Sequence, residues 1–160
     1  MKIAIVHDWL TGMRGGEKCL EVFCKLFPSA DLFTLLHIPG SVSPVIEAHP
    51  IHTSFIQKFP FVHKNYRHYL PLMPFAIEKF DFTGYDLILS SSHCVAKSIK
   101  SQPKSLHVCY CHTPMRYIWD QFDQYFNTEA TGVFTTAIMK TLRPWLQNWD
   151  VRTSERVHDF

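Results

Sequence analysis

The first 27 residues constrain the fold more than any other stretch of the chain. Residues 2–6 form a short run rich in apolar and β-branched side chains, which is the pattern of a buried strand. The chain then passes through Gly15 and Gly16, and from there its apolar side chains recur at helical spacing until Pro28 ends the pattern. A strand, a glycine loop and a helix in this order begin a parallel α/β domain. We therefore predict an α/β fold with a mostly parallel sheet flanked by helices.

The glycine loop has two interpretations. Backbone N–H groups at a helix start are unpaired and carry roughly half a positive charge from the aligned peptide dipoles. Glycines at this point let the backbone approach a bound anion, so Gly15 and Gly16 are suited to a phosphate-binding loop. The alternative is a tight strand-to-helix turn that binds nothing, and the glycines alone do not decide between the two. The loop matches neither G-x-G-x-x-G nor the P-loop, so neither a nicotinamide cofactor nor ATP follows from it.

Composition argues against several classes of protein. The chain of 160 residues is long enough for one domain with a sizeable core. Its 16 basic and 14 acidic residues nearly balance, which argues against a dedicated nucleic-acid binder. No apolar run approaches the roughly 20 residues of a membrane span, and the run after Lys2 is too short for a secretory signal. The five cysteines are odd in number and lie mostly in apolar runs, so we expect a reduced, cytoplasmic protein without disulfides.

A second strand-to-helix junction lies in the middle of the chain. After strands expected at residues 31–36 and 51–54, residues 86–89 form a clear strand that leads into Ser90-Ser91-Ser92-His93. A helix is expected from about Cys94 to Lys100. Serine is a good helix N-cap, so capping alone explains one of the serines. Three in a row at the carboxyl end of a strand lie where open α/β sheets bind their ligands.

Residues 106–111 form the next predicted strand. His107, Cys109 and Cys111 alternate along it and therefore share one face, and His112 follows directly. These side chains suggest zinc, but they contain no C-x2-C pair, and neighbouring residues of a strand point to opposite faces. One metal ion could not collect all four, so we expect no metal site. The remaining predicted helices span residues 115–120 and residues 135–157, the latter with a kink or break at Pro144.

Residues 55–80 differ in character from the rest of the chain. Aromatic and aliphatic side chains are interleaved with Lys58, Lys64 and Arg67, and no acidic residue appears before Glu78. Three prolines would break any helix here into short pieces. One interpretation is a set of short helices packed on the sheet. The other is a surface that meets an anionic or lipid-linked partner, or the bilayer itself.

Four segments, taken in order, resemble a known family. They are His7–Met13 with Gly15–Lys18, Tyr69–Pro74, Gly84–His93 and Tyr110–Tyr117. Together they resemble the N-terminal domain of glycosyltransferase family 4, in particular its bacterial mannosyltransferase-like members in polysaccharide and lipopolysaccharide pathways. The double glycine is unspecific by itself, whereas the Cys-His-Thr-Pro-Met-Arg-Tyr run and the order of the segments are much more specific. The resemblance covers essentially the whole of residues 1–160.

The resemblance implies one half of a GT-B enzyme, in which two Rossmann-like domains enclose the active site. Such enzymes transfer a sugar from a nucleotide-sugar donor to a glycan or lipid-linked acceptor, retain the anomeric configuration and use neither a metal ion nor another cofactor. A complete member is twice as long, so we expect residues 1–160 to be a truncated acceptor-side domain, inactive alone. We further expect a cytoplasmic location, at the inner face of the membrane if residues 55–80 contact lipid, and no nucleic-acid partner.

The resemblance also assigns residues. Gly15 and Gly16 match the loop whose amides approach the donor diphosphate, and His112 matches the catalytic histidine that contacts the donor sugar. Further candidates for the acceptor side of the cleft, without firm roles, are Asp8, Ser91, Ser92, His93 and Arg116. The alternative function is a non-catalytic module that binds glycan, nucleotide or a partner protein. A serine esterase is disfavoured, because no G-x-S-x-G segment is present.

Overall fold

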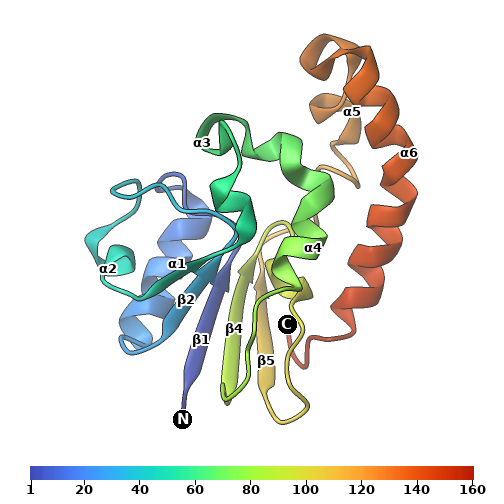
Figure 1. Cartoon of the computed structure of the whole chain (residues 1–160). Helices are drawn as coiled ribbons and strands as arrows, with labels where there is room; N and C mark the ends of the chain where they lie inside the picture. The colour runs from blue at the N-terminus through green and yellow to red at the C-terminus, as the bar shows by residue number, and fades with distance from the viewer.

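The computed structural model contains one five-stranded sheet in which every paired strand is parallel. It describes residues 1–127, 129 and 131–160. The strand order is β3-β2-β1-β4-β5, and helices flank both faces (Figure 1). The strands are β1 (Ile3–His7), β2 (Asp31–Thr34), β3 (Ile51–Thr53), β4 (Leu87–Ser92) and β5 (Leu106–Cys111). The predicted α/β class is confirmed. The strand order is that of a Rossmann-like sheet: β2 and β3 are added on one side of β1, and the chain then crosses over to add β4 and β5 on the other side.

Two hydrophobic clusters lie on opposite faces of the sheet. On one face, α1 (Gly15–Leu26) and α2 (Pro44–Glu47) bury Leu20, Cys24 and Ile46 against Ile5 and Leu32 of the strands. The other face is covered by the segment after β3 and by the long helix α6 (Thr128–Ser154) (Figure 1). Side chains alternate between the two faces along each strand, which is why β1 contributes to both clusters.

The segment after β3 is a chain of short helices, as the prolines predict. They are η1 (Phe55–Lys58), α3 (Val62–Asn65), η2 (Tyr66–Leu72) and α4 (Met73–Ile77). Ile56, Val62, Leu70 and Met73 point inward and are almost completely buried in the larger cluster. The interpretation of residues 55–80 as short helices packed on the sheet is therefore confirmed, whereas a role of their outer side in binding remains a separate question.

The last long helix begins earlier than its sequence suggests. Its pattern predicted residues 135–157 with a break at Pro144, but α6 runs through Pro144 and changes direction at Gly132. Gly132 has a φ of 80°, which a residue with a side chain rarely adopts, so the kink falls where the backbone is least restricted. A short helix, α5 (Phe122–Tyr125), precedes α6.

Two predicted helices are wrong. Residues 94–100 contain only the single turn η3 (Ala96–Ser98), and the carboxylate of Asp8 accepts the backbone N–H groups that lead into it. Residues 115–120 form turns instead of a helix. Their carbonyl groups accept hydrogen bonds from α6: Arg143 donates to Ile118 and Trp119 at 2.9 Å each. In both places a side chain from a distant segment binds the backbone.

The final residues lie beside the outer edge of β5. Asp159 forms a parallel bridge with Val108, and its carbonyl accepts the N–H of Cys109 at 2.9 Å. The N–H of His158 donates to the carbonyl of His107 at the same distance. None of the helices in the described ranges combines the length and apolar character needed to cross a bilayer.

Candidate functional site

The carboxyl ends of β1, β4 and β5 meet at one edge of the sheet. The parallel register places His7 opposite Ser91, and Ser91 opposite Tyr110. These ends surround a cavity of about 320 Å³ next to the start of α1. The residues that line it are Trp9, Arg14, Gly15, Gly16, Glu17, His93, His112 and Tyr117. The cavity therefore lies where the strand order reverses, which is the usual ligand-binding position in open α/β sheets.

The start of α1 supplies unpaired backbone donors to this cavity. The first hydrogen bond within the helix runs from the N–H of Lys18 to the carbonyl of Arg14 at 3.0 Å, so the N–H groups of Gly15 and Gly16 precede the ladder. Glu17 accepts the N–H of Arg14 at 3.0 Å and closes this turn. The helix dipole adds partial positive charge at the same point. An anion is the ligand that this end of the cavity favours.

Gly16 lies against two imidazole rings. A Cβ atom built on Gly16 would be 3.5 Å from Cε1 of His7 and 3.8 Å from Nε2 of His112. A Cβ on Gly15 would meet no atom within 4 Å, so that glycine faces open space. The absence of a side chain at position 16 keeps the space between the helix start and His112 free for a ligand.

A hydrogen-bonded chain joins β1 to the end of β5. The hydroxyl of Ser91 lies 3.1 Å from Nδ1 of His7 and 2.9 Å from Nε2 of His112. A hydroxyl can donate to one ring and accept from the other, so Ser91 fixes the orientation of both. His7 is fully buried, and its Nε2 lies 3.9 Å from the carboxylate of Glu17. The buried chain Glu17–His7–Ser91–His112 thus ends at an imidazole on the cavity wall.

The ionisable groups of this chain are shifted from their ordinary behaviour. Burial lowers the pKa of His112, and the nearby charges of His7 and His93 lower it further. Burial likewise lowers the pKa of His93, against the opposing effect of Asp8. For Glu17, burial raises the pKa, but the interaction with His7 and the backbone N–H of Arg14 outweigh it, and the pKa falls below its usual value. At neutral pH both cavity imidazoles are therefore uncharged, and the carboxylate is ionised.

Asp8 organises the loop behind the cavity. It is fully buried, and its two carboxylate oxygens accept the N–H groups of His93, Cys94, Val95 and Ala96 at 2.6 to 3.0 Å. The same carboxylate lies 3.1 Å from Nδ1 of His93. Four backbone donors occupy both oxygens, so Asp8 has no lone-pair direction left for a ligand. It positions His93, whose ring also packs edge-on against Trp9 at 4.6 Å.

The structure brings most of the sequence-predicted residues together. Gly15, Gly16, His93 and His112 line the cavity, and Ser91 and Asp8 support it from behind. Ser92 is buried and contributes its backbone carbonyl, which accepts the N–H of His112 at 2.9 Å. Arg116 does not belong to this cavity: it lines a different one of about 650 Å³.

Sequence reasoning missed several residues of the site. Glu17 appeared only as a helix-opening residue, although it is 3 % exposed and paired with His7. Trp9 and Tyr117 form an aromatic wall, with ring centres 6.3 Å apart. Glu17 is the third residue of α1, where a carboxylate commonly caps the turn, and this position was the available signal.

The cavity that contains Arg116 is organised around a buried ion pair. Nζ of Lys97 lies 2.7 Å from the carboxylate of Asp150, and both residues are almost completely buried. Cys111 lies on the same wall. A hydrogen bond from Cys109 lowers the pKa of the Cys111 thiol to about 7 against the effect of burial, and the charge of Lys97 helps. Lys97 is paired with Asp150, whereas Arg116, on the same wall, has no carboxylate within ion-pair distance among the described residues.

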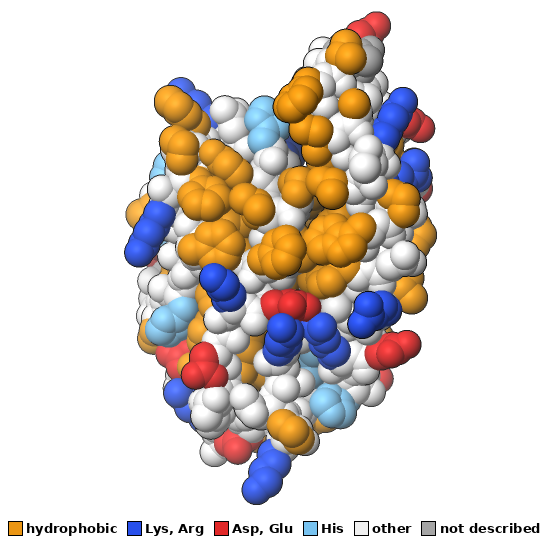
Figure 2. Space-filling view, turned by 45° about the vertical axis from the view of Figure 1, so that its right-hand side comes forward, with side chains coloured by type: hydrophobic (Ala, Val, Ile, Leu, Met, Phe, Trp, Pro, Cys, Tyr) orange, Lys and Arg blue, Asp and Glu red, His pale blue; other side chains and the backbone are white. Residues whose placement is uncertain are grey.

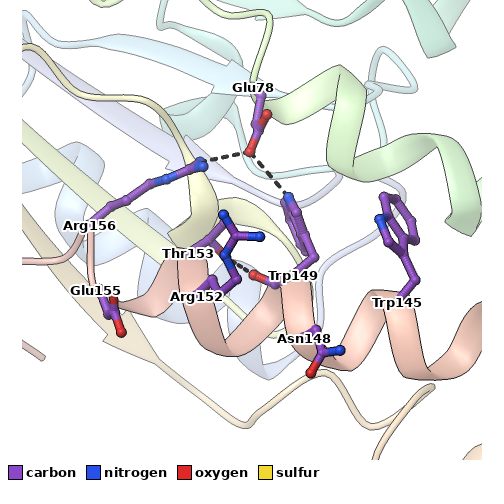
Figure 3. A pocket seen from close by; sticks show the side chains of 8 residues that line it. All are labelled: Glu78, Trp145, Asn148, Trp149, Arg152, Thr153, Glu155 and Arg156. Atoms are coloured by element: carbon purple, nitrogen blue, oxygen red, sulfur yellow. Dashed lines mark hydrogen bonds and ion pairs between the residues drawn. The ribbon is translucent and has the colours of Figure 1, made fainter.

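A third cavity, of about 590 Å³, lies between α4 and α6 (Figure 3). Figure 3 shows Glu78 reaching from the end of α4 toward α6, where it accepts hydrogen bonds from Arg156 at 2.8 Å and Trp149 at 3.1 Å. Lys100 adds an ion pair at 3.0 Å. These contacts tie the two helices together, so Glu78 and Arg156 serve the fold.

Comparisons with known proteins do not identify a ligand for the cavity beside Gly16. Comparisons with models of protein families, with curated proteins and with solved structures gave no match. Within residues 1–127, 129 and 131–160, no group of three or more His, Cys, Asp or Glu side chains is placed to hold a metal ion. The function must therefore be argued from the geometry of this chain.

Proposed function

We propose that this chain is the acceptor-side domain of a retaining glycosyltransferase that uses a nucleotide-sugar donor, with a glycan or lipid-linked acceptor and a role in cell-surface polysaccharide synthesis. One observation carries the proposal most directly: Gly15 and Gly16, at the start of α1, and His112 line the same cavity. An anion site and a neutral hydrogen-bonding ring side by side suit a sugar diphosphate, which is charged at one end and rich in hydroxyls at the other.

The geometry suggests a role for each group. The N–H groups of Gly15 and Gly16 would stabilise negative charge that develops on the leaving diphosphate. His112 would orient the donor sugar, because its Nε2 is held by Ser91 and its other ring nitrogen is available to a hydroxyl. A general-base role for His112 is disfavoured in our proposal, since retention is thought to involve attack from the side of the leaving group. Mannose is the sugar that the resemblance suggests.

Two alternative functions, acyl transfer by a serine and binding without chemistry, can be compared with the geometry of the site. Ser91 is fully buried between two imidazoles, so acyl transfer through its hydroxyl has no route to a substrate. A module that binds glycan or nucleotide without chemistry would use the same cavity and is the second candidate. It is favoured by the small number of charged groups that face the anion site from this chain, since electrostatic stabilisation is usually the largest catalytic contribution.

The test is turnover with a panel of nucleotide sugars, measured on residues 1–160 and on the reading frame extended beyond Phe160. We expect little or no activity from the 160-residue chain, because loss of even one electrostatic donor costs about a hundred- to a thousand-fold. In the extended protein, His112→Ala should lower turnover, whereas His63→Ala, on the exposed side of α3, should not. Gly16→Ala places a methyl group between the helix start and His112 and should weaken donor binding at least about tenfold.

The outcomes separate the candidates. Turnover by the isolated chain would refute the requirement for a second domain. Donor binding by the extended protein without turnover would favour the binding module. Turnover that is unchanged in His112→Ala with every active donor would overturn the role of that histidine.

A further inference from the structure

The outer side of the short helices and the adjoining side of α6 form a continuous apolar surface, which we call the exposed apolar face. Figure 2 shows hydrophobic side chains gathered over the upper and middle part of this side of the molecule. Its exposed members include Phe61, Leu72, Phe75, Phe134, Ile138 and Trp145. Phe75 of α4 stacks on Trp145 of α6, with ring centres 5.7 Å apart, so the two halves form one surface. Monomeric soluble proteins rarely leave such a surface without a partner.

Basic residues predominate in the two segments of this face, although acidic residues border it: Glu78 follows the first segment, Glu129 precedes the second, and Figure 2 shows an acidic side chain directly below the apolar surface. Residues 55–77 contain Lys58, Lys64 and Arg67 and no acidic residue, and residues 131–149 contain two more basic residues and no acidic one. Lys58, Lys64 and Lys140 are exposed, and in the described part of the chain none of them has a carboxylate within ion-pair distance. These cations are therefore available to an anionic partner.

Phe61 shows that the face is not a by-product of folding. Its side chain is 76 % exposed, and its backbone has a φ of 54°, in the left-handed region. That conformation costs a residue with a Cβ roughly 1 kcal/mol or more. Two hydrogen bonds keep it in place, since the N–H groups of Lys64 and Asn65 donate to the Phe61 carbonyl at 3.0 and 2.9 Å. The fold thus presents a large aromatic ring to solvent at a strained position, next to two lysines.

We infer that the exposed apolar face docks on the surface of an anionic phospholipid bilayer. Protruding aromatic and aliphatic groups would enter the boundary between headgroups and acyl chains, while Lys58 and Lys64 would pair with lipid phosphates. Trp145, which is 40 % exposed, has the amphipathic ring that is enriched at this boundary. Charge complementarity favours lipid over a second copy of this chain, because two copies would bring like charges together. The inference does not depend on the proposed sugar transfer.

The experiment is co-sedimentation with vesicles of phosphatidylcholine alone or mixed with phosphatidylglycerol. We expect strong binding only to the mixed vesicles, weakened by added salt. The double variant Lys58→Gln/Lys64→Gln should reduce binding about 25-fold, since each basic residue near such a surface contributes about fivefold. Its matched control is Lys104→Gln, which lies before β5 at the opposite ends of the strands and should bind as the parent does.

A second pair of variants tests the apolar part. Phe61→Asn should reduce binding about tenfold or more, from the lost burial of one aromatic side chain. Asparagine tolerates the left-handed conformation, so this variant should fold. Leu26→Ser on α1, which covers the other face of the sheet, is the control and should have no effect. The fluorescence of Trp145 should shift to shorter wavelength on binding.

Three results would overturn the inference. The first is no binding to the mixed vesicles. The second is binding that survives Phe61→Asn and Lys58→Gln/Lys64→Gln, which would place the contact elsewhere. The third is self-association in analytical ultracentrifugation that Phe61→Asn abolishes, without vesicle binding, which would make a second copy of this chain the occupant.

Discussion

The cavity beside Gly16 and the exposed apolar face are made from different kinds of sequence. The cavity takes its polar groups from segments far apart in the chain: Ser91 meets His7, 84 residues earlier, and Ala96 meets Asp8, 88 residues earlier. The exposed apolar face comes from two continuous stretches, residues 55–80 and residues 134–145 of α6. Around the cavity most buried polar atoms have a hydrogen-bond partner, although Nε2 of His7 has only the carboxylate of Glu17 at 3.9 Å. On the face the side chains have solvent as their neighbour.

This contrast indicates that the polar network around the cavity contributes mainly to stability and the exposed apolar face mainly to binding. Buried polar networks are costly to disturb, because a group that loses its partner remains out of water. Exposed apolar side chains contribute little to the folded state, so their removal should leave the fold intact. Substitutions in the cavity should therefore change the free energy of unfolding, and substitutions on the face should change only binding.

The largest effect is expected at the buried carboxylate. Asp8→Asn replaces an ion that accepts four backbone N–H groups with an amide whose NH₂ faces donors, which should cost about 4 kcal/mol of unfolding free energy. Urea denaturation measures it, with the exposed Asp123→Asn as control at under about 0.5 kcal/mol. A loss below about 1 kcal/mol for Asp8→Asn would contradict the claim that the buried polar groups around the cavity stabilise the fold.

The second-largest effect is expected from acid, which should lower the free energy of unfolding through His107 in β5. Burial lowers the pKa of His107 from 6.5 to about 4, so the unfolded chain binds this proton before the folded one does. The neutral, buried imidazole of His107 therefore stabilises the fold fully above about pH 6.5. This contribution to the free energy of unfolding, up to about 3 kcal/mol, is lost as the pH falls toward 4. Urea midpoints measured at pH 7 and at pH 5 should show the decrease, and His107→Gln should reduce it. An equal pH dependence in that variant would contradict the assignment.

A smaller effect is expected from the hydroxyl that joins the two imidazoles. Ser91→Ala removes one hydrogen bond to His7 and one to His112, at roughly 1 kcal/mol each. We therefore expect a loss of about 1 to 2 kcal/mol by urea denaturation, with the exposed Ser29→Ala unchanged. If Ser91→Ala were as stable as its control, the chain from His7 to His112 would not be a structural unit.

The smallest effect, and of opposite sign, is expected on the exposed apolar face. Phe61→Asn relieves the strain of a left-handed backbone and removes no buried contact. The free energy of unfolding should therefore stay the same or rise by up to about 1 kcal/mol, measured as an unchanged or higher melting temperature. Phe61→Ala, which keeps the strain, should show no gain. A loss of more than about 1 kcal/mol in Phe61→Asn would mean that this ring belongs to the core after all.

Local patterns predicted the parts of the fold that depend on neighbours in sequence. Periodicity located the strands and α1, and prolines predicted the division of residues 55–80 into short helices. The same reasoning failed at residues 94–100 and 115–120, where Asp8 and Arg143 bind the backbone from other parts of the chain. Likewise, the strand ends predicted that Ser91, His93 and His112 would be near one another, but nothing in the spacing showed that Glu17 pairs with His7 or that Arg116 faces another cavity.

By itself the sequence determined the α/β class, the place of the glycine turn, and the aromatic and basic character of residues 55–80, since each follows from side chains within a few positions of one another. Only the tertiary structure decided that Gly16 and His112 share one cavity with His7 behind them, that Asp8 is a structural anchor, and that Phe75 and Trp145 join two helices into one surface. The physical reason is that hydrogen bonds and ring contacts act over a few ångströms in space, whatever the separation along the chain.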